Sequence, residues 1–211
     1  MVKVLGIDEA GRGPAIGPMI MAGVMINESE ENLLSGSKDS KMLVHNVRLA
    51  LDKKIKENSE YKIIEISPKE IDDAVNSKIN NLNWLEAQKQ AEIINSLNPD
   101  KAIIDCPSIN LVSFKNYLRK LINKKNIELV VEHKADQNYI TCSAASILAK
   151  VRREEKISEI KEKYGDVGSG YPSDPKTKKF IINNYRKHQE IFRYSWSTLK
   201  KIVENGEQKK L

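Results

Sequence analysis

The sequence is poor in cysteine and has no long apolar run, and both shortages narrow the class of protein. Only two of its 211 residues are cysteines, Cys106 and Cys142, without Cys-x-x-Cys spacing. This argues against a disulfide-stapled secreted scaffold and against a thiolate metal cage. We expect two buried thiols, and the sequence does not decide whether a single bridge joins them.

No segment approaches the ~18 consecutive apolar residues of a membrane span, and no secretory signal is recognised, so a cytoplasmic protein without membrane contact is predicted.

Internal repeats and low-complexity segments are also missing, and the length fits one ordinary domain. Positive charge is in moderate excess, with 35 Lys and Arg residues against 29 Asp and Glu and a formal net charge of +6. This balance favours a polyanionic partner such as nucleic acid. A solubility surface rich in Lys and Glu explains the same numbers.

Apolar periodicity predicts an α/β domain with a mixed sheet. Two N-terminal strands joined by a short Gly/Pro turn, 2–7 and 19–26, should form an antiparallel hairpin. Strands and helices then alternate, after a predicted loop at 27–43. We expect strands at 61–66, 101–106 and 127–132, and helices at 46–57, 83–97, 111–122, 143–164, 174–187 and 195–203. Ser67 and Glu70 form a capping-box pattern that predicts one further helix start.

Three aspartates, Asp8, Asp105 and Asp136, lie at or just beyond the C-terminal ends of predicted strands. In an open α/β sheet these ends border the crevice where ligands bind, so the three carboxylates are expected to converge. Each could instead be a helix cap or a turn residue. Glu9 can join them only if the chain leaves the strand at that residue, because neighbours on a strand point to opposite faces. The following residues, AGRG, permit such a departure.

A cluster of four carboxylates repels itself unless cations hold it together, and hard divalent ions with oxygen ligands meet that need. The implied ion is Mg²⁺ or Mn²⁺. Two such ions about 3.5–4 Å apart support phosphodiester hydrolysis, and the excess of basic residues could then follow phosphates. The sequence therefore favours a nuclease. Gly11 and Gly13 can expose their backbone to a substrate, although an ordinary hairpin loop explains them too.

Several long motifs, in the same order through most of the chain, resemble the ribonuclease HII family and its archaeal branch in particular. They are GIDEAGRGPAIGPM, KDSK, IIDCPS, EHKAD, YITCSAASILAKV, GDVGSGYPSDPKT and YSWST. The resemblance implies a ribonuclease H-like fold, a five-stranded mixed sheet flanked by helices with a small C-terminal helical region. A catalytic part at 1–170 and a substrate-groove part at 171–211 would belong to the same compact unit.

The resemblance also implies an activity and its substrates. Members hydrolyse the RNA strand of RNA/DNA hybrids and nick duplex DNA on the 5′ side of an embedded ribonucleotide, leaving 3′-hydroxyl and 5′-phosphate ends. They are metal-dependent, and archaeal members commonly act as monomers.

The family's functional residues can be placed on this sequence. Its four metal-binding and catalytic acids fall on Asp8, Glu9, Asp105 and Asp136. Its Gly-Arg-Gly motif, whose backbone contacts the ribose 2′-hydroxyl, falls on Gly11, Arg12 and Gly13, and the tyrosine that stacks on the neighbouring deoxyribose falls on Tyr171. Matching motifs assign phosphate contacts to Lys38, Lys41, Ser143, Ser146 and Lys150.

Other roles stay open for some of these residues, and other functions for the chain. Tyr171 could anchor a loop, Ser146 could pack in an Ala-rich helix, and the lysines could be solvated. A non-catalytic nucleic-acid-binding domain would have no use for four acids that face phosphates. A metal-dependent phosphatase of small molecules would not require the basic balance or the Gly-Arg-Gly motif.

Overall fold

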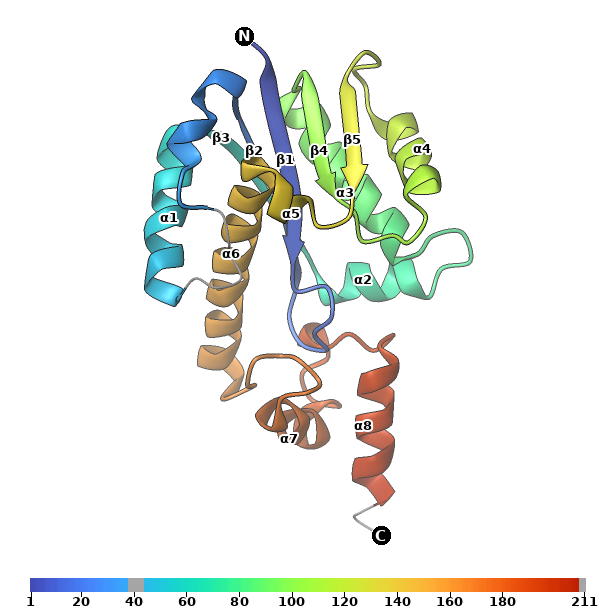
Figure 1. Cartoon of the computed structure of the whole chain (residues 1–211). Helices are drawn as coiled ribbons and strands as arrows, with labels where there is room; N and C mark the ends of the chain where they lie inside the picture. The colour runs from blue at the N-terminus through green and yellow to red at the C-terminus, as the bar shows by residue number, and fades with distance from the viewer. Residues whose placement is uncertain (38–43, 209–211) are drawn as a thin grey trace. The chain divides into compact units, whose positions relative to one another are not determined.

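The computed structural model describes residues 1–37 and 44–208, with side chains to residue 205. Its centre is a five-stranded mixed sheet in the order β3-β2-β1-β4-β5 (Figure 1). β1 is antiparallel to β2 and parallel to β4, and β4 is parallel to β5. The strands are β1 Lys3–Ala10, β2 Met19–Asn27, β3 Glu60–Ile66, β4 Lys101–Asp105 and β5 Glu128–Glu132. The predicted five-stranded mixed sheet, with its N-terminal hairpin, is confirmed.

The helices largely follow the predicted periodicity. The α-helices are α1 His45–Asn58, α2 Pro68–Val75, α3 Leu82–Leu97, α4 Leu111–Leu121, α5 Ala135–Asn138, α6 Ile140–Tyr164, α7 Pro175–Asn184 and α8 Ser197–Gln208, with 3-10 helices η1 Glu28–Leu34 and η2 Gln189–Ile191. Ser67 and Glu70 form the predicted capping box at α2. Within the described part of the chain, none of these helices has the length and apolar character needed to cross a membrane.

Several helical segments differ from the sequence prediction. Part of the loop expected at 27–43 forms η1, and its Leu34 is buried against residues of β2, α1 and α6. The one-turn helix α5 was not expected at all, and α6 begins at Ile140 rather than at 143. Such short segments depend on tertiary contacts, which apolar periodicity does not encode.

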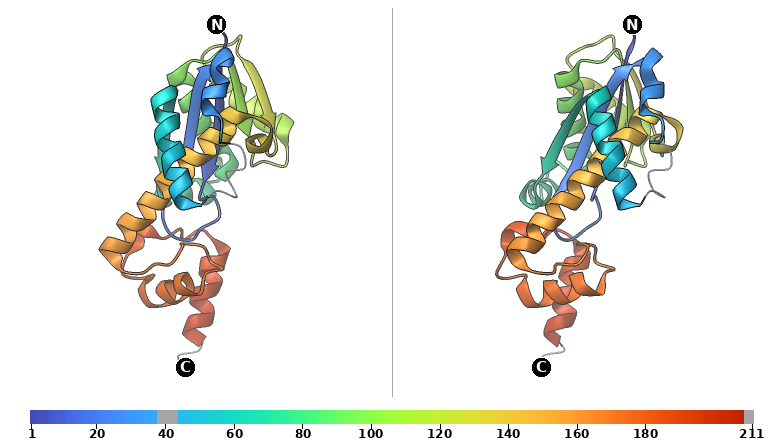
Figure 2. Two further views of the ribbon diagram at one scale, coloured as in Figure 1. Left: turned by 60° about the vertical axis from the view of Figure 1, so that its left-hand side comes forward. Right: turned by 90° about the vertical axis from the view of Figure 1, so that its left-hand side faces the viewer.

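The chain divides into two compact units. The first comprises residues 1–10, 20–64 and 83–151, and the second comprises 11–19, 65–82 and 152–211. In the first unit, α1 and the first part of α6 lie on one side of the sheet, where they share a core with β2 (Figure 2). Ile93 of α3 packs over Gly23 together with Leu5 and Ile7, so α3 lies against the opposite face.

The second unit has a core of its own. Apolar residues from the segment 11–19, from the end of α6 and from the C-terminal helices pack together, among them Ile16, Ile157, Phe180 and Phe192. Ile16 and Phe192 also form an isolated β-bridge. The expected small C-terminal helical region is therefore present as α7 and α8, and Asp174, the first residue of the helix expected at 174–187, is the N-cap of α7.

Gly6 allows α6 to begin directly against β1. A Cβ atom at this position would lie 2.2 Å from the backbone nitrogen of Cys142 and 2.2 Å from the backbone carbon of Thr141. The Cys142 thiol contacts the carbonyl of Ile103 at 3.3 Å on the same side of the sheet. One turn further along α6, the Ser146 hydroxyl reaches the carboxylate of Asp8.

Replacing Gly6 should therefore disrupt the first unit. We expect Gly6→Ala to lower the free energy of unfolding by more than ~3 kcal/mol, because the added methyl group overlaps main-chain atoms that cannot rotate away. Gly23→Ala is the matched control, since its nearest neighbour, at 2.4 Å, is a side-chain methyl of Ile93 that can move; a loss of ~1–3 kcal/mol is expected there. Urea unfolding measures both variants, and similar losses would contradict the argument.

Candidate functional site

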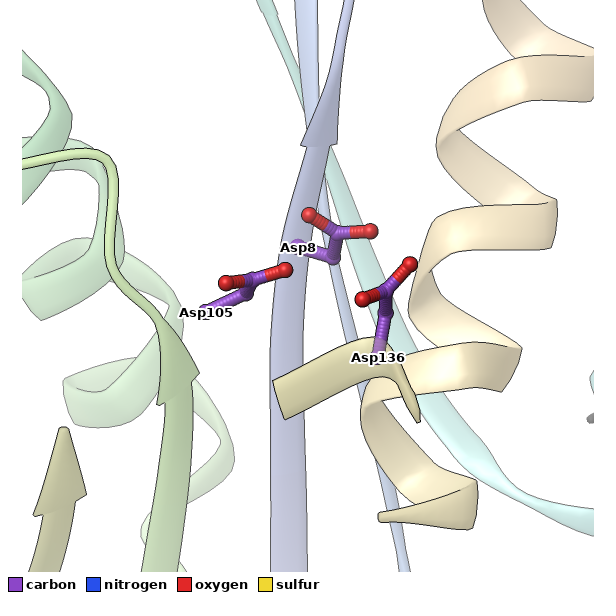
Figure 3. A group of neighbouring side chains, drawn as sticks. All are labelled: Asp8, Asp105 and Asp136. Carbon is purple, nitrogen blue, oxygen red and sulfur yellow. The ribbon is translucent and has the colours of Figure 1, made fainter. Parts of the chain in front are cut away.

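Three carboxylates converge in the first unit. One oxygen from each of Asp8, Asp105 and Asp136 lies within 4.8 Å of the others. Figure 3 shows the three side chains pointing toward one another from β1, from the end of β4 and from α5. We call this group the aspartate cluster. The predicted convergence of these three residues, which lie far apart in the sequence, is present in the structure.

Strand register and a left-handed turn bring these residues together. Ile7 of β1 is paired in parallel with Ile104 of β4, so the next residues, Asp8 and Asp105, leave matched positions on neighbouring strands. After β5, Lys134 adopts φ 59° and turns the chain into α5. The Lys134 peptide N–H donates to Asp105 Oδ1 at 2.9 Å. The N–H groups of Ala135 and Asp136 also hydrogen bond to Asp105. The same turn therefore fixes the Asp105 carboxylate and brings Asp136 next to it.

The cluster resists full ionisation. Burial raises the pKa of Asp8 to about 7, and the charges of Asp105 and Asp136 add to this effect. The Ser146 hydroxyl and the Glu9 peptide N–H, which donates to Asp8 Oδ1 at 2.7 Å, oppose it. The pKa of Asp105 is also raised, first by burial and then by Asp136. Clustered oxygen donors that repel one another suit a hard divalent cation, so the residues fit such an ion.

Glu9 was expected to leave the strand and join the three aspartates, and the structure differs from this expectation. The chain does not leave the strand at Glu9, because β1 continues to Ala10 and Glu9 is paired with Met21 of β2. The pleat directs neighbouring side chains to opposite faces, so Glu9 starts on the other face from Asp8. Burial raises the pKa of the Cys106 thiol to about 11, and Glu9 is one of the charges that add to this. Among the residues described, the cluster holds the three aspartates without Glu9, whose metal-binding role stays a prediction.

The predicted phosphate-binding residues occupy several environments. Ser143 and Ser146 are buried on α6, where the Ser143 hydroxyl donates to the carbonyl of Ser37 and Ser146 hydrogen bonds to Asp8. Both hydroxyls therefore face protein groups. Lys150 is partly buried on the same helix. Lys38 and Lys41 lie outside the described residues, and the phosphate contacts of all five remain predictions.

Both cysteines are buried and free, as expected, so the possible bridge between them is absent.

The Gly-Arg-Gly motif and Tyr171 belong to the second unit and lie close together there. Gly11 has φ +82°, and a Cβ atom on it would lie 2.5 Å from Cδ of Arg153, so the position requires glycine. Gly13 is exposed, and its Cβ atom would lie 3.9 Å from Cε1 of Tyr171. Tyr171 is 43% exposed, which does not fit a buried loop anchor. The buried Arg153 guanidinium lies 5.6 Å from the centroid of this tyrosine ring.

Sequence reasoning missed a residue that supports this motif. Arg193 is completely buried and donates hydrogen bonds to the carbonyls of Gly11 and Arg12, at 2.7 and 2.9 Å. The available signal was a single arginine among aromatic residues in FRYSW. That pattern does not reveal a contact with residues so far away in the sequence.

Comparison with known proteins places this mixed sheet and its aspartate cluster in the class of hydrolases with a ribonuclease H-like fold. A family model described as Ribonuclease HII matches residues 5–199. The ribonuclease HII of Methanobrevibacter smithii is 46% identical over 207 residues, covering 95% of this chain and 98% of that protein. The crystal structure of ribonuclease H2 from Pyrococcus horikoshii OT3 aligns with a TM-score of 0.87 at 37% identity, over 98% of this chain and 99% of that one. The chain therefore belongs to the ribonuclease HII family, whose type 2 ribonuclease H activity acts on nucleic acid.

The raised pKa of Asp8 predicts how the stability of the metal-free protein depends on pH. The folded protein keeps the Asp8 proton up to a pKa of about 7, whereas the reference value is 3.8. Unfolding releases this proton between the two values, so the free energy of unfolding falls as pH rises through that window. Over the same pH range, the free energy of unfolding of Asp8→Asn should fall by roughly 2–4 kcal/mol less than that of the wild type.

Urea unfolding in chelator at several pH values measures this difference. Asp73→Asn, on the exposed side of α2, is the control and should follow the wild-type profile. Parallel profiles for Asp8→Asn and wild type would show that Asp8 ionises freely in the fold.

Proposed function

We propose that this ribonuclease hydrolyses the RNA strand of RNA/DNA hybrids and nicks duplex DNA on the 5′ side of an embedded ribonucleotide, leaving 3′-hydroxyl and 5′-phosphate ends. The observation that carries the proposal is the convergence of Asp8, Asp105 and Asp136 in a member of the ribonuclease HII family. A domain that only bound nucleic acid would gain nothing from clustered acids that repel phosphates.

Asp8, Asp105 and Asp136, together with Glu9, would hold one or two Mg²⁺ or Mn²⁺ ions. The oxygen donors, their separation and the raised pKa values of Asp8 and Asp105 support this assignment for the three aspartates. Glu9 is included on the family resemblance alone. When bound by these carboxylates, a divalent cation would supply a lower pKa to an attacking water and offset negative charge on the phosphoryl group.

The chain's own groups prepare this chemistry. Three consecutive peptide N–H groups that begin at Lys134 fix the Asp105 carboxylate, and the Ser146 hydroxyl fixes that of Asp8. Asp136, supplied by α5, would bind a cation or orient the attacking water. Preorganised groups of this kind need no rearrangement when the reaction occurs.

The second unit supplies recognition of the sugars. The backbone of Gly11, Arg12 and Gly13 contacts the ribose 2′-hydroxyl, which is the group that distinguishes RNA from DNA at one position. Tyr171 stacks on the following deoxyribose, and its exposed ring beside Gly13 supports this role. Residues 171–211 bind the duplex through exposed lysines of α7 and α8, which are Lys178, Lys179, Lys200 and Lys201. Further phosphate contacts are assigned to Lys38, Lys41 and Lys150, whereas the buried hydroxyls of Ser143 and Ser146 bond to Ser37 and Asp8.

A labelled DNA duplex with a single ribonucleotide tests the activity and the metal site together. The wild type should nick this duplex on the 5′ side of the ribonucleotide with Mg²⁺ or Mn²⁺ and should be inactive in chelator. Asp8→Asn should reduce the rate by roughly 10²-fold or more, because one of the clustered ligands loses its charge. Asp52→Asn changes a buried aspartate of α1 outside the cluster and should stay close to wild type. Cleavage by Asp8→Asn at the wild-type rate would exclude the proposed site.

Tyr171 should matter most where a ribonucleotide is followed by DNA. Stacking on a side chain contributes ~1–3 kcal/mol, so we expect Tyr171→Ala to slow cleavage of the single-ribonucleotide duplex roughly tenfold or more and to slow cleavage of a continuous hybrid less. Tyr171→Phe retains the ring and should retain the rate. Tyr61→Ala, which removes a tyrosine of similar exposure from β3, is the control. Equal, small losses on both substrates would indicate a structural tyrosine.

A further inference from the structure

Arg193 of the second unit carries a positive charge in the protein interior, where burying a charge costs free energy. Its side chain is 0% exposed, yet the guanidinium is surrounded by main-chain carbonyls of the segment 11–19. Nη2 donates to Gly11 at 2.7 Å, Nη1 to Arg12 at 2.9 Å and Nε to Gly17 at 3.0 Å. A buried charge is tolerated only when its donors are satisfied, so these contacts are what hold the side chain in place.

Trp196 completes the set of carbonyl contacts. Its indole Nε1–H donates to the carbonyl of Gly13 at 3.2 Å, and its ring centroid lies 5.3 Å from the Arg193 guanidinium carbon. Each of the three carbonyls of the Gly-Arg-Gly motif therefore accepts a hydrogen bond from one of two side chains. These two side chains stand three residues apart on one C-terminal segment.

The contacts determine how the peptide groups of the motif are oriented. In a trans peptide the C=O and the following N–H point in opposite directions, and this protein has no cis peptide bond in the residues described. Because the carbonyls of Gly11 and Arg12 both point to Arg193, the N–H groups of Arg12 and Gly13 both point away from it. Two successive N–H groups with a shared direction suit an oxygen atom of a ligand.

The segment that carries Arg193 and Trp196 is itself anchored. Asp72 of α2 accepts hydrogen bonds from the peptide N–H of Tyr194 at 2.7 Å and from that of Ser195 at 2.9 Å, and also from the Ser195 hydroxyl. The residues between Arg193 and Trp196 are therefore fixed to a helix. A shift of the main chain that carries Arg193 and Trp196 would require these bonds to break.

We propose that Arg193 and Trp196 are positioning residues that set the discrimination between ribonucleotide and deoxyribonucleotide. They do so by fixing the peptide planes of the Gly-Arg-Gly motif in the orientation that contacts a sugar hydroxyl. The proposal rests on the proposed function of that motif. Neither side chain needs to touch the substrate.

Binding measurements in an inactive background separate this role from general stability. With Asp8→Asn as the reference protein, the affinity for a single-ribonucleotide duplex is compared with that for the all-DNA duplex of the same sequence. We expect Trp196→Phe, which keeps a ring but loses the donor, and Arg193→Lys, which keeps the charge but loses the fork, to lower this ratio about tenfold. Affinity for the all-DNA duplex should change less than about twofold, because phosphate contacts dominate it.

The matched controls come from the first unit. Trp84→Phe changes a tryptophan whose ring packs against that of Tyr117, with the ring centroids 4.3 Å apart, and Arg119→Lys removes a guanidinium that donates to the carbonyl of Ile127 at 2.8 Å. Neither should alter the ratio. If Arg193→Lys does not fold, Trp196→Phe decides the question.

The outcomes distinguish two failures. An unchanged ratio in folded Trp196→Phe, or equal losses of affinity for both duplexes, would overturn the positioning role and leave the proposed function intact. Equal affinity of the reference protein for the two duplexes would overturn sugar recognition by the motif, and this inference with it.

Discussion

The burial and mutual repulsion of three clustered carboxylates are the constraint on which the first unit depends. Asp8, Asp105 and Asp136 bring oxygens within 4.8 Å of one another, and burial with neighbouring charge raises the pKa of Asp8 to about 7. The surrounding structure holds the three carboxylates in place. Gly6 lets α6 approach β1, and Ser146 of α6 hydrogen bonds to Asp8. At the turn, the Lys134 N–H donates to Asp105, and the chain then continues to Asp136. Such an arrangement costs stability in the metal-free protein and suits a divalent cation, which is a common compromise at catalytic sites.

In the second unit the buried charge is positive instead of negative. It buries a positive charge, that of Arg193, and satisfies it with the carbonyls of Gly11, Arg12 and Gly17. The result is a loop whose backbone orientation is set by side chains instead of by regular secondary structure. In the proposed function the first unit supplies hydrolysis and the second supplies recognition of the sugar. Hydrolysis therefore depends on the negative charges of the aspartate cluster, and sugar recognition depends on the positive charge of Arg193.

The sequence predicted the parts of the site that follow from strand ends. Asp8 and Asp105 were identifiable because parallel strands end on the same side of a sheet and both residues close an apolar run. Asp136 was placed just beyond a strand, but its helix α5 depends on the left-handed Lys134 and on contacts with Asp105, which periodicity does not show. The glycines after Glu9 suggested that the strand ended there, whereas pairing with β2 continues to Ala10. Tertiary hydrogen bonds outweighed the local turn propensity at that point. Arg193 could not be predicted, because its role exists only through main-chain contacts with residues near the other end of the chain.

The most direct test of the central claim is a calorimetric titration of Mn²⁺ into the metal-free protein at pH 7, in buffers of different ionisation enthalpy. If the aspartate cluster is the cation site, wild type binds Mn²⁺ and releases protons, since Asp8 is partly protonated near its pKa of about 7. Asp8→Asn should then bind at least about tenfold more weakly and without that release. Equal affinity and equal proton release in the two proteins would contradict the account.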